Sequence, residues 1–234
     1  MLADHINSLD WKQLRQALDD DGYVVTPKIL TAADCRGLIA LFDDDRHFRA
    51  TIEMRRHGYG SGIYKYFRNP LPGPIQQLRQ ALYRQLADIA NDWANRLDSE
   101  QTFPATLADF LDICHQHGQH RPTPLLFRYQ QGDFNTLHQD TYGRVGFPFQ
   151  VLTVLSRPGH DFTGGEFLLV TQRPRAQSIG EAINLERGQL LIFPNRTRPL
   201  RSERGHYRAN VRHGVSRVRS GTRHTLGVIF HDAE

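Results

Sequence analysis

The apolar residues of this chain change their period near residue 120, and that change limits the folds that the chain can form. Before this point apolar side chains recur every three to four residues, most clearly over residues 75–97, which predicts a long amphipathic helix. Ser8 and Thr31 stand where side chains cap helices, so we expect two shorter helices to begin after them. The stretch YVVTPKIL between these helices predicts a short strand.

From about Pro124 the period becomes two, which is the period of a β-strand. The segments with this pattern, separated by Gly, Pro or Asn turns, are PLLFRYQ, FPFQVLTVLS, GEFLLVTQ, INLERGQLLIFP, YRANVRHGVSRV and RHTLGVIFH. Helices followed by many strands indicate a mainly β protein with N-terminal helices (α+β), whose core is a sandwich or a jelly roll. We expect one integrated domain, in which a helical region over residues 1–120 supports a β core over residues 121–234.

The composition excludes several classes of protein. No run approaches the roughly 20 apolar residues that a membrane helix needs. The N-terminus, MLADHINSLDWKQ, lacks the basic and apolar regions of a secretory signal. Cys35 and Cys114 are two lone thiols, which predict neither a disulfide framework nor a zinc cluster. We therefore expect a cytoplasmic protein without a membrane association, and no motif indicates a partner protein.

Charge is divided unevenly along the chain. Residues 1–120 carry 13 Lys and Arg against 16 Asp and Glu, whereas residues 121–234 carry 16 against 9. Nine arginines fall between Arg196 and Arg223. A basic half is typical of proteins that bind nucleic acid, although a general preference for Arg over Lys has the same effect. Arg217 illustrates both possibilities, since it either contacts phosphate or coats an outer face.

The stretch NTLHQD places a histidine and an aspartate two residues apart. At the edge of a strand, residues with this spacing project to the same side, so His138 and Asp140 can reach one metal ion. Two histidines and one carboxylate form the facial site of non-haem Fe(II) oxygenases, which leaves coordination positions open. The third ligand must come from a later strand; His213 has such a position, and His231 is the spare candidate.

An oxygenase that uses 2-oxoglutarate also needs a cation for the distal carboxylate of this co-substrate. A guanidinium suits the task because its planar donors match a carboxylate. Arg223 lies ten residues after His213, and Thr225 is on the same face of the same predicted strand. We therefore predict that Arg223 and Thr225 hold the distal carboxylate.

The β half resembles the prolyl 4-hydroxylase-type 2-oxoglutarate oxygenases in four blocks, which cover about 110 residues. RYQQGDFNTLHQD is similar to their His-x-Asp segment, and FTGGEFLLV to their Gly-Gly-Glu strand. ERGQLLIFPN is similar to the strand before the distal histidine, and HGVSRVRSGTRHTL to the ending that carries the histidine and the arginine. The resemblance implies a double-stranded β-helix (jelly-roll) core and a dependence on Fe(II), 2-oxoglutarate and O2. It also implies that Tyr129 adds a hydroxyl to the co-substrate site.

More narrowly, the chain resembles a bacterial oxygenase family assigned to nucleic-acid oxidation and likened to AlkB-type dealkylating enzymes. The blocks GYGSGIYKYF and RPLRSERGHYRANVRHGVSR and the terminal IFHDA carry this resemblance. It implies hydroxylation or demethylation of a nucleic acid or nucleotide, and DNA repair as the process. The alternative is a hydroxylase of a protein side chain or a small metabolite, as in the prolyl hydroxylases.

The segment over residues 56–74, RHGYGSGIYKYFRNPLPGP, combines glycines with aromatic side chains. Glycines favour a mobile loop, so we expect a lid over the site that recognises substrate. Tyr64 and Tyr66 would stack on a flipped or single-stranded base. Lys65 and Arg68 would contact phosphate. The other interpretation is a turn whose tyrosines lie half-buried against the barrel.

Overall fold

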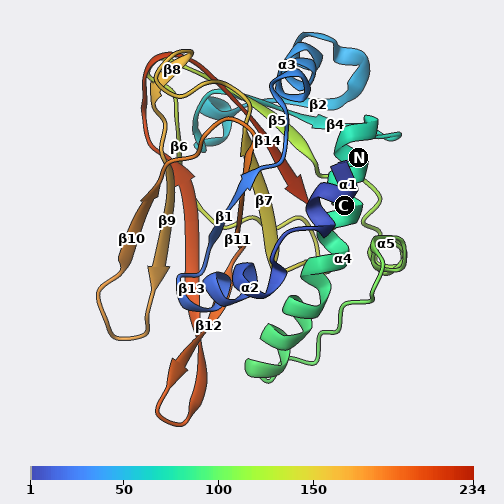
Figure 1. The fold of residues 1–234 in the computed structure, drawn as a ribbon, viewed down its shortest axis with the longest axis vertical. Helices are drawn as coiled ribbons and strands as arrows, with labels where there is room; N and C mark the ends of the chain where they lie inside the picture. The colour runs from blue at the N-terminus through green and yellow to red at the C-terminus, as the bar shows by residue number, and fades with distance from the viewer. Residues whose placement is uncertain (1) are drawn as a thin grey trace.

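The computed structural model describes residues 2–234, and it shows two β-sheets with α1, α4 and α5 together on the right of them (Figure 1). The α-helices are α1 (Leu2–Asn7), α2 (Trp11–Asp20), α3 (Ala32–Ala40), α4 (Gly73–Arg96) and α5 (Leu107–Gln116). The short 3-10 helices are η1 (Leu41–Asp43), η2 (Asp45–His47) and η3 (Met54–His57). None of the helices within residues 2–234 combines the length and the apolar character needed to cross a bilayer.

The helix predictions are confirmed, with one change at a cap. The long amphipathic helix is α4, which begins at Gly73 with Pro74 in its first turn. Thr31 caps α3 in a capping box with Asp34, whose carboxylate accepts a hydrogen bond from the Thr31 amide. The N-cap of α2 is Asp10 rather than Ser8, because the Asp10 carboxylate accepts from the Gln13 amide.

The larger sheet is antiparallel and places the strands in the order β1-β11-β7-β14-β5-β4-β2, with β8 paired to β14. These strands are β1 (Val24–Lys28), β2 (Phe48–Glu53), β4 (Ile63–Phe67), β5 (Leu125–Gln130), β7 (Phe149–Val154), β8 (Phe162–Gly164), β11 (Gln189–Pro194) and β14 (Val218–Ile229). The order is far from the order along the chain, as expected for a jelly roll.

The smaller sheet has the order β10-β9-β13-β6-β3, with β12 paired to β13. Its strands are β3 (Gly60–Ser61), β6 (Phe134–His138), β9 (Phe167–Gln172), β10 (Ile179–Ile183), β12 (Thr197–Ser202) and β13 (Gly205–Val215). The β9–β10 and β12–β13 hairpins project from the lower part of the molecule (Figure 1). Every strand pair in both sheets is antiparallel, so the predicted jelly-roll core is confirmed.

Alternation along the strands divides the core into two layers. One face of the larger sheet packs against the helices, where Leu126, Val151 and Leu226 join side chains of α4 in one buried cluster. The other face meets the smaller sheet, where Leu152 and Phe193 pack with β9 and β13 residues. The helices therefore brace the larger sheet from outside, and the space between the two sheets is left for a site.

The first 120 residues also supply strands that the periodicity did not reveal. YVVTPKIL contains β1 as predicted, but β2, β3 and β4 are additional. The expectation of a single glycine-rich loop over residues 56–74 is wrong for Ile63–Phe67, which is β4 and pairs with both β2 and β5. The remaining part holds η3 and β3, and the Tyr59 carbonyl accepts hydrogen bonds from the Thr136 amide and hydroxyl. This segment is therefore built into both sheets.

Candidate metal and co-substrate site

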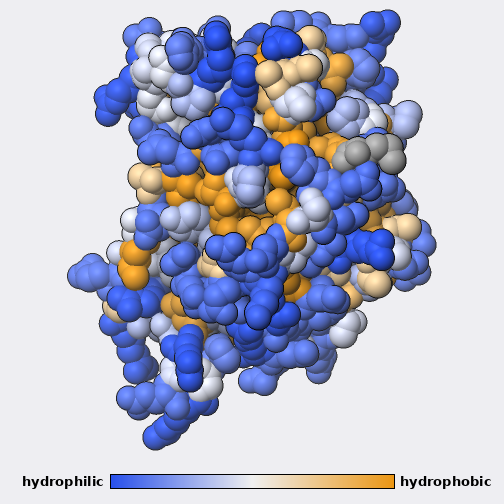
Figure 2. All heavy atoms as spheres, in the orientation of Figure 1, coloured by the Kyte–Doolittle hydropathy of each residue, from blue (hydrophilic) through white to orange (hydrophobic). Residues whose placement is uncertain are grey.

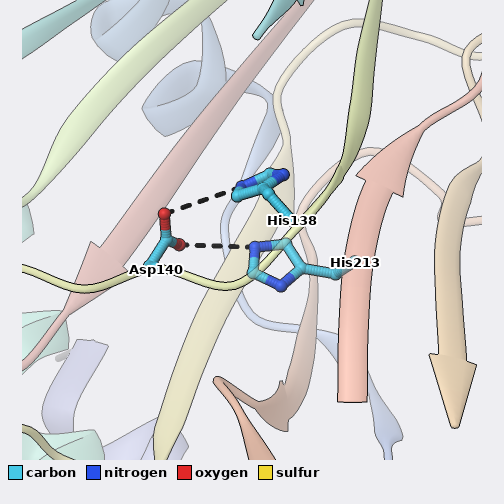
Figure 3. Close-up of side chains that lie close together, drawn as sticks. All are labelled: His138, Asp140 and His213. Carbon is cyan, nitrogen blue, oxygen red and sulfur yellow. Dashed lines mark ion pairs between the residues drawn. The ribbon is translucent and has the colours of Figure 1, made fainter. Parts of the chain in front are cut away.

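His138, Asp140 and His213 come together between the two sheets (Figure 3). The two histidines lie opposite one another on β6 and β13, since His138 pairs with His213 in the antiparallel register. Their ring centroids are 4.3 Å apart. The Asp140 carboxylate reaches both rings, with one oxygen 3.6 Å from His138 Nε2 and the other 3.3 Å from His213 Nε2. One ligand atom of each residue lies within 4.8 Å of the others, which is the spacing of a single cation site.

Three neighbouring side chains fix the Asp140 segment. The Gln150 amide donates to Asp140 Oδ2 at 2.8 Å, and the Tyr142 hydroxyl donates to Oδ1 at 3.2 Å. Asn195 accepts from the Asp140 backbone amide, and its own amide donates to the Asp140 carbonyl. Burial alone would raise the pKa of Asp140, but the hydrogen bond and charge of His213, with His138 and Gln150, hold it below the ordinary value. The carboxylate is therefore ionised at neutral pH.

Both imidazoles are oriented for ligation through Nε2. His138 Nδ1 lies 2.7 Å from the Thr136 carbonyl, which requires a proton on Nδ1 and leaves the Nε2 lone pair free. Burial and then the neighbouring His213 lower the pKa of His138, so the neutral ring predominates at neutral pH. His213 packs against Phe167 and Phe193, at centroid distances of 5.9 and 5.0 Å. Two imidazole nitrogens and one carboxylate oxygen suit a divalent first-row metal.

These three side chains open into a cavity of about 280 Å³ between the sheets. Tyr129 and Thr225 line it, and so do Tyr64 and Tyr66. Arg223 lies behind the wall that Tyr129 and Thr225 form, and it pairs with Tyr129 in the β5–β14 register. Its Nη1 is 3.4 Å from the Thr225 hydroxyl. The three residues predicted to hold the co-substrate are thus neighbours on one side of the cavity.

Arg223 is a buried cation whose charge has no counterion in direct contact. Its side chain is 1% exposed, its Nε has no hydrogen-bond partner, and it forms no ion pair within residues 2–234. Burial lowers its pKa to about 10, against the opposing influence of Tyr129 and Glu166. A desolvated guanidinium without a carboxylate is costly, so this residue is suited to a ligand that brings a carboxylate.

The glycine pair of FTGGEFLLV makes room for this guanidinium. Gly165 has a φ of +67°, and a Cβ at this position would lie 2.8 Å from Arg223 Cδ and 3.1 Å from Val218 Cγ2. Any larger residue at position 165 would strain the backbone and would displace Arg223 or Val218. The motif therefore has a physical reason here, which is the close approach of the β8–β9 turn to the buried arginine.

The residues predicted to meet substrate are divided between two faces of β4. Tyr64 and Tyr66 face the cavity and pack edge to face at 5.3 Å. Lys65 points to the opposite side, where its ammonium donates to the Phe42 carbonyl at 2.9 Å and to Asp45 at 2.6 Å. The expected phosphate contact of Lys65 is therefore wrong, since its charge is already paired inside the protein.

Arg68 and Arg217 are exposed and do not line the cavity. Arg217 donates to the Gly132 carbonyl at 2.6 Å, and its guanidinium lies 4.6 Å from the Phe134 ring centroid. His231 does not join the cluster: its Nδ1 accepts from the Phe147 amide, and its ring faces Tyr142 at 5.6 Å. The spare ligand is thus occupied elsewhere.

Sequence reasoning missed Tyr142, Gln150 and Asn195, which hold Asp140. Two of them had a usable signal. Gln150 is the single amide within the otherwise apolar strand segment FPFQVL, so an inward polar role was readable from the pattern. Tyr142 repeats the two-residue spacing that already links His138 to Asp140. Asn195 follows a strand end and carries no such signal.

Comparisons with known proteins identify the family of this chain. A family model described as "Oxygenase, catalysing oxidative methylation of damaged DNA" matches residues 62–233. Two uncharacterized proteins of Mycobacterium tuberculosis strains are 51% identical over 164 residues, which is 70% of this chain and 70% of each relative. The chain belongs to this family, Oxygenase-NA, and is an oxygenase.

Solved structures share the fold at low sequence identity. A prolyl-4-hydroxylase of Pseudomonas putida has a TM-score of 0.56 and 16% identity over 98% of both chains. A 2OG-Fe(II) oxygenase family oxidoreductase of Burkholderia pseudomallei has a TM-score of 0.56 and 15% identity, covering 97% of this chain and 93% of the other. A Trichoplax adhaerens prolyl hydroxylase in complex with a hypoxia inducible factor peptide has a TM-score of 0.56 and 13% identity, covering 97% and 90%. The fold is that of the 2-oxoglutarate- and Fe(II)-dependent oxygenases.

Proposed function

We propose that this oxygenase is an Fe(II)- and 2-oxoglutarate-dependent dioxygenase that hydroxylates a nucleic-acid or nucleotide substrate. Where the oxidised carbon is an N-methyl group, hydroxylation leads to demethylation. The observation that carries the proposal is a cation site that opens into the cavity, together with an anion site behind one wall of the same cavity. His138, Asp140 and His213 form the first, and the buried Arg223 forms the second.

The donor set fits Fe(II). Nε2 of His138 and of His213 and one Asp140 oxygen would hold the ion and leave positions open for other ligands. With 2-oxoglutarate and O2, bound Fe(II) supplies the oxidation of a substrate C–H bond, with release of succinate and carbon dioxide. The same donors also suit other divalent metals, so the metal content has to be measured on the isolated protein.

The chain's own residues position the co-substrate and keep water out. Arg223 would receive the distal carboxylate in a site without solvent, with Thr225 and Tyr129 offering hydroxyls beside it. Phe167 and Phe193 pack against the His213 ring and surround it with apolar side chains. Gln150 and Tyr142 hold the Asp140 carboxylate in one orientation, which keeps it aimed at both imidazoles.

Two features support a nucleic-acid substrate. The family description concerns damaged DNA. The cavity is also walled by Tyr64, Tyr66 and Tyr142, whose rings provide faces against which a base can stack. A base inside a duplex would not reach a carboxylate that is only 18% exposed, so the target nucleotide would have to leave the stack. The alternative is a hydroxylase of a protein side chain or a small metabolite. It is supported only by the fold that this chain shares with the prolyl hydroxylases.

The test is succinate release from labelled 2-oxoglutarate with a panel of methylated oligonucleotides, nucleosides and peptides. Replacing His138, Asp140 or His213 with Ala should abolish release and leave the circular dichroism spectrum unchanged, because the loss removes metal ligands. His206→Ala is the matched control, since His206 is exposed on the same strand as His213. Full turnover in His213→Ala would refute the ligand assignment. Stimulation by peptides alone would move the substrate to the alternative class.

A further inference from the structure

A second groove continues outward from Asp140. It has a volume of about 400 Å³ and lies between the C-terminal half of α4, the segment over residues 139–148 and the β12–β13 hairpin. Gln139, Asp140, Thr141 and Tyr142 line both the groove and the cavity. A ligand that extends from the cavity past Asp140 therefore enters this groove.

The charge of the groove is strongly one-sided. Arg144, Arg196 and Arg208 line it, all three are exposed, and none of them forms an ion pair within residues 2–234. Asp140 is the one carboxylate among the lining residues that the structure describes, and it faces the histidines. Some other surface arginines, such as Arg46 and Arg157, are paired with nearby aspartates. Three unpaired guanidiniums along one groove favour a polyanionic ligand.

The groove is tied to the candidate metal ligands through the backbone. Gln139 stands between His138 and Asp140, and its side-chain amide Nε2 donates to the backbone carbonyls of Arg196 and Val211, at 2.8 Å each. Arg208 and Asn210 lie on one face of β13, and Asn210 pairs with Thr197 of β12. The position of Arg196 is thus fixed relative to the cluster. Figure 2 shows that hydrophilic side chains cover the projecting end of this hairpin.

We propose that this groove binds the phosphodiester backbone of a single-stranded nucleic acid whose target base occupies the cavity beside Asp140. The assignment rests on the proposed function and specifies where its substrate is held. Guanidinium groups match phosphate oxygens through paired donors, and two or three successive phosphates can be met by three arginines placed along one groove. In this arrangement the groove arginines contact the phosphates and do not distinguish between bases, whereas the cavity selects the base.

The experiment measures binding of a fluorescein-labelled single-stranded 12-mer by anisotropy at several salt concentrations. The test variant is Arg144→Gln with Arg208→Gln. The matched control is Arg173→Gln with Arg175→Gln, which removes the same charge from two equally exposed, unpaired arginines in the β9–β10 turn. Log K falls as log salt rises, and the loss of two phosphate contacts should make this slope shallower by about 1.4. Relative to 1 M salt, this change corresponds to an affinity that is ~14-fold weaker at 0.15 M salt.

The 2-oxoglutarate affinity of the test variant should stay at the wild-type value, because the groove arginines do not touch the co-substrate site. Equal weakening in both double variants, or none in either, would overturn the groove assignment while leaving a nucleic-acid substrate in place. If the wild-type protein binds no oligonucleotide and no oligonucleotide stimulates succinate release, the proposed substrate class fails as well. Salt-sensitive binding of a glutamate-rich peptide in place of the oligonucleotide would transfer the groove to an acidic protein partner.

Discussion

Replacement of Arg223 by Met should weaken 2-oxoglutarate binding strongly without weakening the fold. Arg223 is 1% exposed and has an Nε without a partner; Met keeps an unbranched apolar side chain but ends before the guanidinium. In the ligand-free protein its buried charge has the Thr225 hydroxyl at 3.4 Å and the Tyr129 and Phe162 rings at 5.7 and 5.8 Å, and it forms no ion pair within residues 2–234. The substitution therefore removes a desolvated charge that no carboxylate compensates, so the free energy of unfolding should stay level or rise by about 1–4 kcal/mol.

The effect on the co-substrate has the opposite sign. A distal carboxylate that enters this site would be left without its cation, and breaking a buried charge pair in this way costs about 2–5 kcal/mol. This corresponds to a loss of about 30- to 4,000-fold in affinity, since 1.4 kcal/mol is tenfold. Arg223→Lys should recover only part of the loss, because a point charge does not reproduce the planar donors of a guanidinium.

The assay is anaerobic titration of the Fe(II)-loaded protein with 2-oxoglutarate, together with urea unfolding of the ligand-free protein. Arg219→Met is the matched control, because Arg219 is on the same strand and exposed. At a concentration of 100 times its dissociation constant, the co-substrate should stabilise the wild type by about 2.7 kcal/mol and the Met variant by much less. An affinity within threefold of wild type in Arg223→Met would refute the anchor. A loss of unfolding free energy as large as the loss of binding would mark Arg223 as structural.

Two further predictions concern the surroundings of the site. Gly165→Ala should displace Arg223 and weaken 2-oxoglutarate by about tenfold, which corresponds to ~1.4 kcal/mol, because the new Cβ lies 2.8 Å from Arg223 Cδ. Gly180→Ala, which meets nothing within 4 Å, is its control in the same titration, and equal behaviour of the two variants would contradict the packing argument. Burial, and then the charge of Arg79, lower the pKa of His231 to about 4, from about 6.5 in an unfolded chain. The folded protein therefore binds fewer protons between these values, so stability is complete above pH 6.5 and falls by about 2 kcal/mol on acidification to pH 4.5. Urea unfolding at both pH values should show a smaller fall in His231→Asn, whose amide oxygen can still accept from Phe147; an unchanged fall would exclude His231 as the cause.

The elements that local pattern determines were predictable. The α4 helix follows from a sustained period of 3.6, and the Thr31 cap from a side chain that satisfies a free helix amide. The His138–Asp140 spacing predicted a shared direction, and the structure places both side chains on one point. These features need only the residues within one or two turns, so no tertiary information was required.

The β4 strand escaped prediction because its neighbours decide its role. The residues IYKYF carry aromatic side chains together with a lysine, and glycines precede them, so the segment reads as a flexible loop. In the folded chain Lys65 is buried, and it is satisfied by Asp45 and the Phe42 carbonyl, which are about twenty residues earlier. Alternation then sends Tyr64 and Tyr66 to the cavity. Asp45 and the Phe42 carbonyl determine the side of the strand to which Lys65 points. These partners are too far away in the sequence for the local pattern to reveal them.

The division of the site between two sheets explains why the barrel must be intact before any chemistry is possible. The cation ligands come from β6, the segment after it and β13, whereas Arg223, Thr225 and Tyr129 come from β14 and β5. Within residues 2–234 the two groups belong to different sheets, which are joined by the short β5–β6 and β13–β14 connections. Side chains packed between the sheets, including Leu152, Phe167 and Phe193, also hold the two groups apart. Close-packed interiors resist small displacements. The α4 helix packs on the outer face of the larger sheet and so supports it from the side opposite the site. One face of β13, which carries Arg208 and Arg212, remains exposed to solvent. A rigid site between the sheets and an uncovered basic hairpin beside it are thus consequences of the same one-sided helical layer.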